Sequence, residues 1–358
     1  MTRESSRLNK CARPTIAITM GDPLGVGPEV IAKAVRDERI CDTCTALVVG
    51  DAEIMRHAAV AIAPTAAVRT MSAANQAVRE PGVIPVLDLA NARDIDLSKR
   101  QPTAAAGRAA GEAIARAARM ALAGEVAAIV TAPINKEAMR LAGCERTGHT
   151  EMLAHLAGAT GVAMLLIWQN MRVAHVTTHL ALRDVPGAIT TARVLRTIHL
   201  TDETLGRLGV ARPRIAVAGL NPHAGESGLF GDEERLAIRP AVDEAGRAGL
   251  DVTGPLPPDT VFAQLRGGNY DAVVAMYHDQ GHIAIKTLSF TPAAGERAAS
   301  MAGVNVTMGL PIIRTSVDHG TAFDIAGQGI ASEQSMIEAI LLAAQLARSG
   351  AGGVRSGT

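Results

Sequence analysis

The sequence predicts an α/β protein with a mixed, mostly parallel sheet. Short runs of β-branched residues alternate with segments rich in Ala, Leu, Arg and Glu, the pattern of repeated strand–helix units. Two predicted strands, 162–168 and 172–177, are separated only by a few residues around Gln169 and Asn170, which favours an antiparallel hairpin. The chain has 358 residues, which is enough for roughly two domains of about 150 residues each.

The predicted strands are short apolar runs, and the predicted helices are longer segments rich in Ala and Leu. In chain order, the strands are expected at residues 15–19, 46–49, 83–87, 127–131, 162–168, 172–177, 214–218, 272–276 and 304–307. The run 83–87 is the weakest, because Pro85 has no backbone N–H, so we expect an edge strand there or none. The helices are expected at residues 28–35, 104–123, 136–142, 192–208, 232–248, 258–266 and 332–348. Residues 1–13 and 349–358 are expected to be terminal tails.

The composition argues against several classes of protein. The 35 basic and 35 acidic residues cancel, and aromatic residues are only 2% of the chain, so nucleic-acid binding by charge or by stacking is disfavoured. The sequence has no apolar run of about 18 residues and no apolar segment after Met1, so we expect a cytoplasmic protein. Cys41 and Cys44 form a CxxC pair without a second pair or a nearby His, which favours reduced thiols over a zinc or redox site.

Five of the predicted strands run directly into a short cluster of polar, Gly or Pro residues. These clusters are residues 20–23, 132–136, 178–180, 219–223 and 277–281. In open α/β sheets, ligands bind beyond the carboxyl ends of the strands. We therefore expect the five clusters to share one site, which favours an enzyme over a scaffold protein.

Three of these clusters contain a histidine a few residues after a strand, namely His179, His223 and His278. Three imidazoles with one open position are typical of a catalytic divalent metal. Asp259 and Asp279 are candidates for additional ligands or for carboxylates that orient the imidazoles. The alternative is that each histidine is an ordinary turn residue, because only the fold could bring the three together.

Two further segments are candidates for binding anions or a nucleotide. The loop 21–27 carries three glycines between a strand and a helix, and it could cradle an anion on its N–H groups or be only a tight turn. Loop 318–327 is rich in Gly and Ala, which would let a flat ligand approach, and Asp324 could accept hydrogen bonds from a ribose. Other candidates for anion contacts, each of which could equally be a surface residue, are His149, Thr150, Lys286 and Arg314.

Loop 318–327 resembles the nucleotide loop of the isocitrate/isopropylmalate dehydrogenase superfamily. The other motifs are similar to those of the 4-hydroxythreonine-4-phosphate dehydrogenase (PdxA) family, in order along residues 15–345. They are residues 19–29, 131–136, 147–151, 178–180, 220–226, 277–281 and 313–322. The resemblance implies a two-domain α/β/α fold with the active site in the interdomain cleft. It places residues 1–138 and 305–358 in a first lobe and residues 139–304 in a second, which carries the metal ligands and dimer contacts.

The resemblance also implies NAD, a divalent metal such as Zn, Mg or Co, and a homodimer that shares the metal site. The metal ligands would be His179, His223 and His278, with the third histidine supplied by the partner subunit. The substrate contacts would be His149, Thr150, Lys286, Asn305 and Arg314. The NAD contacts would be His319, Gly320, Thr321, Ala322, Asp324 and Gly327.

The implied reaction is oxidation of the 3-hydroxyl of 4-phosphohydroxy-L-threonine or a close 4-phosphorylated hydroxy acid, followed by decarboxylation of the β-keto acid. Lys286, Asp259 and Asp279 are the candidate bases. The family's paralogues imply two alternatives, a 4-phospho-D-threonate or D-erythronate dehydrogenase and an aromatic cis-dihydrodiol dehydrogenase of the terephthalate type. More distant alternatives are a non-catalytic metabolite-binding protein and a metal-dependent hydrolase.

Three features depart from the vitamin-pathway enzymes of the family. His282 begins the segment His-Ile-Ala-Ile-Lys, where those enzymes place apolar residues. The link 287–302 is longer than usual and lies between two predicted substrate contacts, so it could reshape the pocket. Residues 328–336 resemble the paralogous branch. Retention of Lys286, Asn305 and Arg314 nevertheless favours a phosphorylated substrate.

Overall fold

The computed structural model describes residues 13–62, 66–289 and 303–350, which fall into two compact units. Unit 1 combines Met1–Gly158 with Leu310–Thr358, and unit 2 is Ala159–Gly309. Both predicted lobe boundaries, after residues 138 and 304, lie earlier in the chain than these limits. Most of the predicted tails, together with residues 290–302 of the long link, lie outside the described residues.

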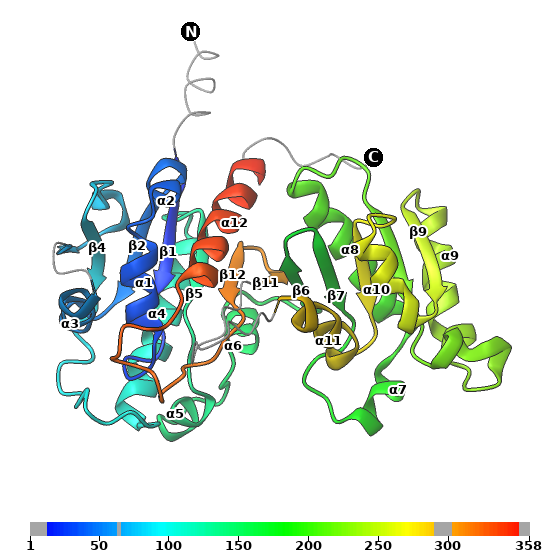
Figure 1. Ribbon diagram of the computed structural model, residues 1–358, viewed down its shortest axis with the longest axis horizontal. Helices are drawn as coiled ribbons and strands as arrows, with labels where there is room; N and C mark the ends of the chain where they lie inside the picture. The colour runs from blue at the N-terminus through cyan, green and yellow to red at the C-terminus, as the bar shows by residue number, and fades with distance from the viewer. Residues whose placement is uncertain (1–12, 63–65, 290–302, 351–358) are drawn as a thin grey trace, which may run out of the picture. The chain divides into compact units, whose positions relative to one another are not determined.

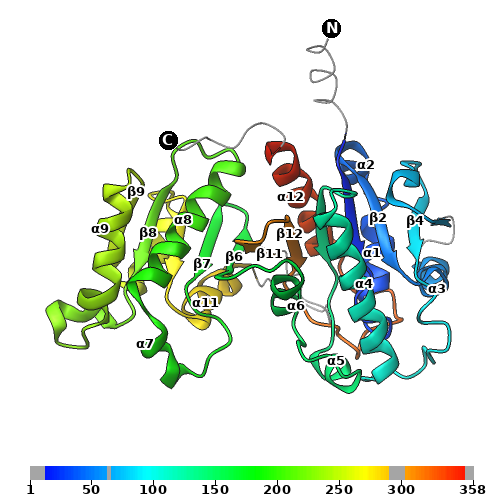
Figure 2. The ribbon, with the colours of Figure 1, turned by 180° about the vertical axis from the view of Figure 1, so that it is seen from behind.

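Unit 1 is built on a parallel sheet with the strand order β3-β4-β2-β1-β5-β12 (Figure 1). The strands are β1 (Thr15–Thr19), β2 (Thr45–Gly50), β3 (Ala67–Met71), β4 (Val83–Asp88), β5 (Ala128–Thr131) and β12 (Arg314–Val317). Its helices are α1 (Gly27–Ala34), α2 (Glu38–Thr43), α3 (Ala52–Ile62), α4 (Ala104–Leu122), α5 (Lys136–Leu141), α6 (His149–Leu156) and α12 (Gln334–Gly350). α1 and α12 cover one face of the sheet, and α4 and α6 cover the other (Figures 1 and 2).

The Ala-rich helix α4 shows how unit 1 is packed. The Thr103 side chain caps its first turn by accepting a hydrogen bond from Ala106 N. Its buried face consists mainly of Ala and Gly, and a Cβ at Gly107 would overlap the Ala138 carbonyl of α5. These small side chains let α4 lie close to its neighbours, so the apolar sequence pattern becomes a dense core rather than a surface patch.

Unit 2 is a mixed sheet with the strand order β11-β6-β7-β10-β8-β9. Its strands are β6 (Ala163–Trp168), β7 (Met171–His175), β8 (Arg214–Ala218), β9 (Asp251–Leu256), β10 (Ala272–Ala275) and β11 (Val304–Met308). Its helices are α7 (Val185–Ala188), α8 (Thr191–Arg207), α9 (Arg239–Arg247), α10 (Pro258–Arg266) and α11 (His278–Ser289). α8 and α9 lie on one face, and α10 and α11 lie on the other (Figures 1 and 2).

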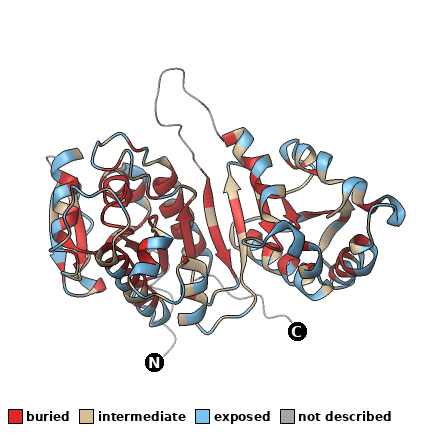
Figure 3. Ribbon diagram, turned by 90° about the horizontal axis from the view of Figure 1, so that it is seen from below, coloured by how far each residue is buried: buried red, intermediate tan, exposed pale blue. Residues whose placement is uncertain are grey.

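The predicted mixed, mostly parallel sheet is confirmed. β6 pairs antiparallel with both β7 and β11, and the other pairs in unit 2 are parallel. The tight turn between β6 and β7 places Gln169 at a φ of 53°. Buried residues concentrate along the strands of both units (Figure 3). In the part of the chain that the structure describes, we find no helix whose length and apolar character would let it cross a membrane.

One expectation about an individual element is wrong, and one predicted helix is irregular. β4 is an interior strand despite Pro85, because burial of Ile84, Val86 and Leu87 outweighs one missing N–H, and the mostly exposed β3 occupies the edge instead. The predicted helix 232–248 is present as continuous helical backbone over residues 233–247, but its first part is not a regular α-helix, because Pro240 lacks the N–H that would bond back along such a helix. A π-helical turn, Glu234–Ile238, therefore precedes α9.

Candidate active site

In unit 1, polar side chains gather at the carboxyl ends of three neighbouring strands. The register places Thr19 of β1 opposite Thr131 of β5, and Thr131 opposite Ser316 of β12. All three are buried, and the Thr19 hydroxyl has no hydrogen-bond partner among the described residues. Buried polar groups are normally paired, so this edge of the sheet has the character of a binding site.

Arg314 and His149 form the polar centre of this edge. Arg314 is only 6% exposed and donates a hydrogen bond from a terminal nitrogen to Thr131 Oγ1 at 2.7 Å. Burial lowers the pKa of Arg314 to about 10, and the charge of Glu151 acts in the opposite direction. Burial and then the Arg314 charge push the pKa of His149 well below its usual value, so its imidazole is neutral. A buried guanidinium beside a neutral imidazole suits a phosphate or carboxylate.

Helix α6 places His149 and Thr150 at this site. They are the first two residues of α6, whose N-cap is Gly148. The Nε2 atom of His149 is buried and has no hydrogen-bond partner in the part of the chain that is described. The ring hydrogen bond to the Ala132 backbone places the proton of the neutral imidazole on Nδ1, so Nε2 is an acceptor. The first N–H groups of a helix attract anions, so the donors that this corner of unit 1 offers to a ligand are the Arg314 guanidinium and the N–H groups at the start of α6.

The hydrogen bonds of loop 21–27 favour a tight turn over an anion cradle, the two alternatives that the sequence left open. Asp22 N donates to Pro133 O, and Val26 N donates to Thr321 O. Leu24 N and Gly25 N both donate to Asp22, to its Oδ1 and its backbone O in that order. These donors are therefore used within the protein. The glycines are needed for packing instead, since a Cβ at Gly25 would lie 2.8 Å from Thr321 O.

Helix α1 holds the predicted nucleotide loop in place. The Glu29 carboxylate accepts hydrogen bonds from Gly327 N and Gly329 N, and Lys33 Nζ donates to Gly329 O at 2.8 Å and Ala331 O at 2.6 Å. A Cβ at Gly320 would meet open space, so a flat ligand can approach the backbone there.

The side chains of this loop are also compatible with a nucleotide. Asp324 is exposed, and its carboxylate can therefore reach a ribose. The Nε2 atom of His319 is buried without a partner among the residues described. Ala322 adopts a φ of 44°, which only a held backbone tolerates.

Asp22 gives this edge a measurable pH dependence. It is 1% exposed, its Oδ2 has no partner within the described segments, and burial raises its pKa from 3.8 to about 6. A raised folded-state pKa means that the stability contributed by the protonated form is complete below pH 3.8 and is lost as the pH rises through about 6. We expect Asp22→Asn to exceed the wild type in free energy of unfolding by up to about 3 kcal/mol near neutral pH.

Urea unfolding of both proteins at about pH 4 and about pH 7.5 checks this expectation. The advantage of the Asn variant should shrink at the lower pH, because the wild-type carboxyl is then largely protonated. An advantage that is the same at both pH values would contradict the assignment to Asp22.

In unit 2, the structure brings together two of the three predicted metal ligands. His179 follows β7, His278 begins α11, and their ring centroids lie 6.1 Å apart. His278 Nδ1 lies 2.6 Å from Asp279 Oδ1. This hydrogen bond places the His278 proton on Nδ1 and leaves Nε2 with a free lone pair, the arrangement that orients metal-binding histidines.

His223 lies in a separate, unusual segment of unit 2. It is exposed, and it borders a cavity of about 600 Å³ that Glu226, Arg235 and Arg239 also line. Within a single chain, the described residues contain no group of three His, Cys, Asp or Glu side chains that could hold a metal ion.

The segment that carries His223 is a left-handed turn. Residues 223–227 all have φ between 44° and 84°, including the non-glycine residues His223, Ala224, Glu226 and Ser227. Such a run costs about 1–2 kcal/mol per non-glycine residue, so neighbouring contacts must hold it.

Glu234 supplies those contacts and was not anticipated. Its carboxylate accepts from Leu220 N and Asn221 N, each at 2.7 Å, and from Asn221 Nδ2 at 2.9 Å. A Cβ at Gly225 would lie 2.7 Å from it. Glu234 falls in a predicted helix, where it resembles an ordinary surface residue. The closely spaced glycines at 225, 228 and 231 are the feature of the sequence that indicates an unusual backbone conformation here.

The candidate bases occupy different positions in unit 2. Asp279 is engaged with His278, Asp259 lies in the first turn of α10, and Lys286 lies two turns after His278 on α11. Asn305 lies on β11, opposite Leu166 of β6. The choice of base among Asp259, Asp279 and Lys286 stays a prediction.

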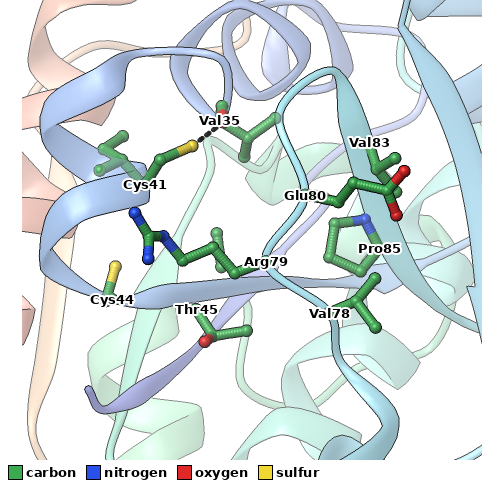
Figure 4. A pocket seen from close by; sticks show the side chains of 11 residues that line it. Val35, Cys41, Cys44, Thr45, Val78, Arg79, Glu80, Val83 and Pro85 are labelled. Atoms are coloured by element: carbon green, nitrogen blue, oxygen red, sulfur yellow. Dashed lines mark hydrogen bonds between the residues drawn. The ribbon is translucent and has the colours of Figure 1, made fainter. Parts of the chain in front are cut away.

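Cys41 and Cys44 are free thiols beside a small cavity in unit 1 (Figure 4). The cavity holds about 20 Å³, room for about one water molecule. Burial raises the pKa of both thiols, that of Cys44 to about 12. Neither is a thiolate near neutral pH, which disfavours metal or redox chemistry.

A family model, curated relatives and solved structures each match most of the chain. The family model described as "Pyridoxal phosphate biosynthetic protein PdxA" matches residues 42–343. The D-threonate 4-phosphate dehydrogenase of Salmonella typhimurium is 48% identical over 333 residues, which cover 93% of this chain and 99% of the relative. The 4-hydroxythreonine-4-phosphate dehydrogenase of Geobacter metallireducens is 48% identical over 342 residues, which cover 95% and 98%. The solved structure of a 4-hydroxythreonine-4-phosphate dehydrogenase from Klebsiella pneumoniae matches with a TM-score of 0.80 and 46% identity, covering 93% of this chain and 99% of that chain.

Proposed function

Because the chain belongs to the PdxA family, we propose that it is an NAD-dependent, divalent-metal-dependent dehydrogenase of a 4-phosphorylated 3-hydroxy acid. The substrate is 4-phosphohydroxy-L-threonine or a close relative. The observation that carries this proposal is the buried pair Arg314 and His149 at the carboxyl edge of the unit 1 sheet. The Arg314 guanidinium supplies the charge and the donors for a terminal phosphate, and the His149 imidazole lies beside it.

The residues of the chain divide the work of this reaction. Arg314, His149 and Thr150 bind the phosphate, and residues 319–327 receive the dinucleotide. A bound divalent metal would polarise the 3-hydroxyl, and NAD would accept the hydride from C3. Asp279 keeps Nε2 of His278 available as a ligand, and a base chosen from Asp259, Asp279 and Lys286 takes the hydroxyl proton.

Oxidation of the 3-hydroxyl produces a β-keto acid, which explains the second step. The bond between the carboxylate and C2 breaks, and CO2 leaves. The electron pair of that bond passes to the enolate of the 3-keto group, which is then protonated. The same chemistry applies whether C2 carries an amino group or a hydroxyl group, so it does not distinguish 4-phosphohydroxy-L-threonine from 4-phospho-D-threonate or 4-phospho-D-erythronate.

The metal site is shared between two subunits in this proposal, with His179, His223 and His278 as ligands. One chain does not assemble three ligands among its described residues. Large apolar side chains lie exposed beside two of the histidines, which is typical of a surface that a partner covers. They are Leu180 and Leu182, which follow His179 in the sequence, and Leu229, Phe230 and Leu236, which follow His223.

Phe230→Asp tests this interface. Phe230 is 48% exposed, and its ring centroid lies 6.4 Å from that of His223. A charge buried at an interface costs about 3–5 kcal/mol, so we expect the dimer dissociation constant to rise at least about 10²-fold, with loss of metal affinity. Light scattering after size exclusion measures the mass. Val60→Asp in α3, also at an exposed apolar residue, should leave the protein dimeric. A Phe230→Asp protein that stays dimeric would contradict this interface.

The substrate is tested by NADH formation with metal-reconstituted protein. Equal concentrations of 4-phosphohydroxy-L-threonine, 4-phospho-D-threonate, 4-phospho-D-erythronate and a carboxylated cyclohexadiene diol are compared, each with NAD and with NADP. We expect a phosphorylated acid to be preferred over the diol, because the diol leaves Arg314 without a phosphate. Preference for the diol, or no NADH with any compound, would refute the proposal, and the latter would favour a binding protein or a hydrolase.

We also propose that the protein acts in the cytoplasm. Cys41, Cys44 and Cys144 are free thiols, and the reducing conditions of that compartment keep thiols in this state.

A further inference from the structure

A pair of buried imidazoles lies directly behind the proposed metal ligand His278. His175 ends β7 and is 1% exposed, and His282 lies one turn after His278 on α11 and is 5% exposed. His282 Nδ1 is 3.2 Å from His175 Nε2 and 3.1 Å from the carbonyl oxygen of His278. Neither histidine belongs to the ligand set described above.

The hydrogen-bond partners fix the protons of this pair. The His278 carbonyl can only accept, so Nδ1 of His282 carries a proton and donates it. His175 Nε2 then acts as the second acceptor, and the His175 proton is on Nδ1. Burial, reinforced by His282, lowers the pKa of His175 to about 3, so this ring is neutral. The hydrogen bond between the two rings and the one to the α11 backbone hold them together, so they are not two independent side chains.

The imidazole ring of His278 packs against the His175–His282 pair. The rings of His278 and His282 are stacked, with centroids 3.8 Å apart and planes 10° from parallel. The edge of the same His278 ring is held by Asp279 Oδ1. One contact fixes the ring plane and the other fixes its rotation within that plane, so together they fix the direction of Nε2.

Gly281 makes the arrangement possible. A Cβ at this position would overlap His175 Nε2 and would lie 2.6 Å from Val173 Cγ1. The absence of a side chain lets α11 approach β7 closely enough for His282 to reach His175.

We propose that the His175–His282 pair positions the imidazole of His278 and thereby sets the metal affinity of the site. This inference rests on the proposed role of His278 as a metal ligand. His175 and His282 are positioning residues, because they act through His278 and not on the metal. The ions concerned are those that favour imidazole, such as Zn²⁺ and Co²⁺.

Titration with Co²⁺ measures the effect without relying on catalysis, because the visible absorption of bound Co²⁺ reports both affinity and geometry. We expect His282→Leu to raise the Co²⁺ dissociation constant about 10–100-fold, the usual effect of removing a group that orients a ligand. His282→Phe keeps a flat ring on His278 but loses the hydrogen bonds, and it should fall between Leu and the wild type. His199→Leu, at an exposed histidine of α8, should match the wild type.

Thermal melting and NAD binding accompany each titration. An affinity of His282→Leu within about twofold of the wild type, in a folded protein, would overturn the inference. Should the Leu variant fail to fold, His282→Phe decides instead, and an unchanged affinity and spectrum would overturn it. If wild-type protein binds no Co²⁺, or if His278→Ala binds it normally, the proposed metal site itself is wrong. Loss of binding in His278→Ala with no change in either His282 variant would refute the positioning role alone.

Discussion

Replacing His223 with alanine is expected to lower metal-dependent turnover by at least about 10³-fold while leaving the fold intact. A metal ligand contributes several kcal/mol to stabilising charge on the reacting oxygen, and about 4 kcal/mol corresponds to a thousandfold in rate. The His223 side chain is exposed and lies in a turn that Glu234 holds through backbone groups of neighbouring residues. Its removal therefore takes away a ligand but little packing.

Initial rates with saturating Zn²⁺, Mg²⁺ or Co²⁺ and the melting temperature measure the two effects separately. His57→Ala in α3, also at an exposed histidine, is the matched control and should keep full activity. Near-normal turnover of the His223→Ala enzyme would refute the assignment of this residue as a ligand. A large fall in melting temperature would show that the imidazole also supports the turn.

Replacing Arg314 with methionine is expected to separate activity from stability. The kcat/KM for the phosphorylated substrate should fall about 10²–10³-fold, because a buried guanidinium forms strong charge-assisted hydrogen bonds to a phosphate. The stability of the apoprotein should stay equal or rise, since burial of the Arg314 charge is the dominant influence on its pKa. Apolar residues of similar volume often replace a buried charge without loss.

The comparison substrate for this variant is the same acid without its phosphate. Activity toward 4-hydroxythreonine is low in the wild type if the phosphate supplies binding energy, and it should change little in Arg314→Met. Arg119→Met, at an exposed position of α4, controls for the loss of a positive charge. An equal loss of activity on both substrates would mean that Arg314 has a structural role and does not recognise the phosphate.

The sequence predicts those elements whose pattern is local. The alternation of strands and helices, and the hairpin around Gln169, depend on side-chain periodicity and turn residues, and both are confirmed. Elements that depend on distant packing were missed or misplaced. β3 is a mostly exposed strand without an apolar run. β9 contains Gly and Pro, and it exists because it pairs with β8.

The site was predictable to the same extent. Residues that follow strands could be identified from the sequence, and the structure brings Arg314, His149 and Thr131 together at one edge of the unit 1 sheet. For loop 21–27, the sequence could not decide between an anion cradle and a tight turn, because it does not show that Pro133 O and Thr321 O accept two of the hydrogen bonds from the loop. Glu234 escaped notice because its role depends on a backbone conformation that is disfavoured for L-residues.

The interrupted course of unit 1 has a consequence for its synthesis on the ribosome. β5 lies between β1 and β12, but β12 and α12 come from the second chain segment of unit 1 and are translated only after all of unit 2. The nascent chain therefore carries an unpaired edge at β5, a strand that is fully buried in the finished fold, until residues 132–313 have emerged, and such edges invite association between chains. Unit 2 is continuous in sequence and can complete its own sheet first, so chaperone dependence should be concentrated in the interval before α12 leaves the ribosome.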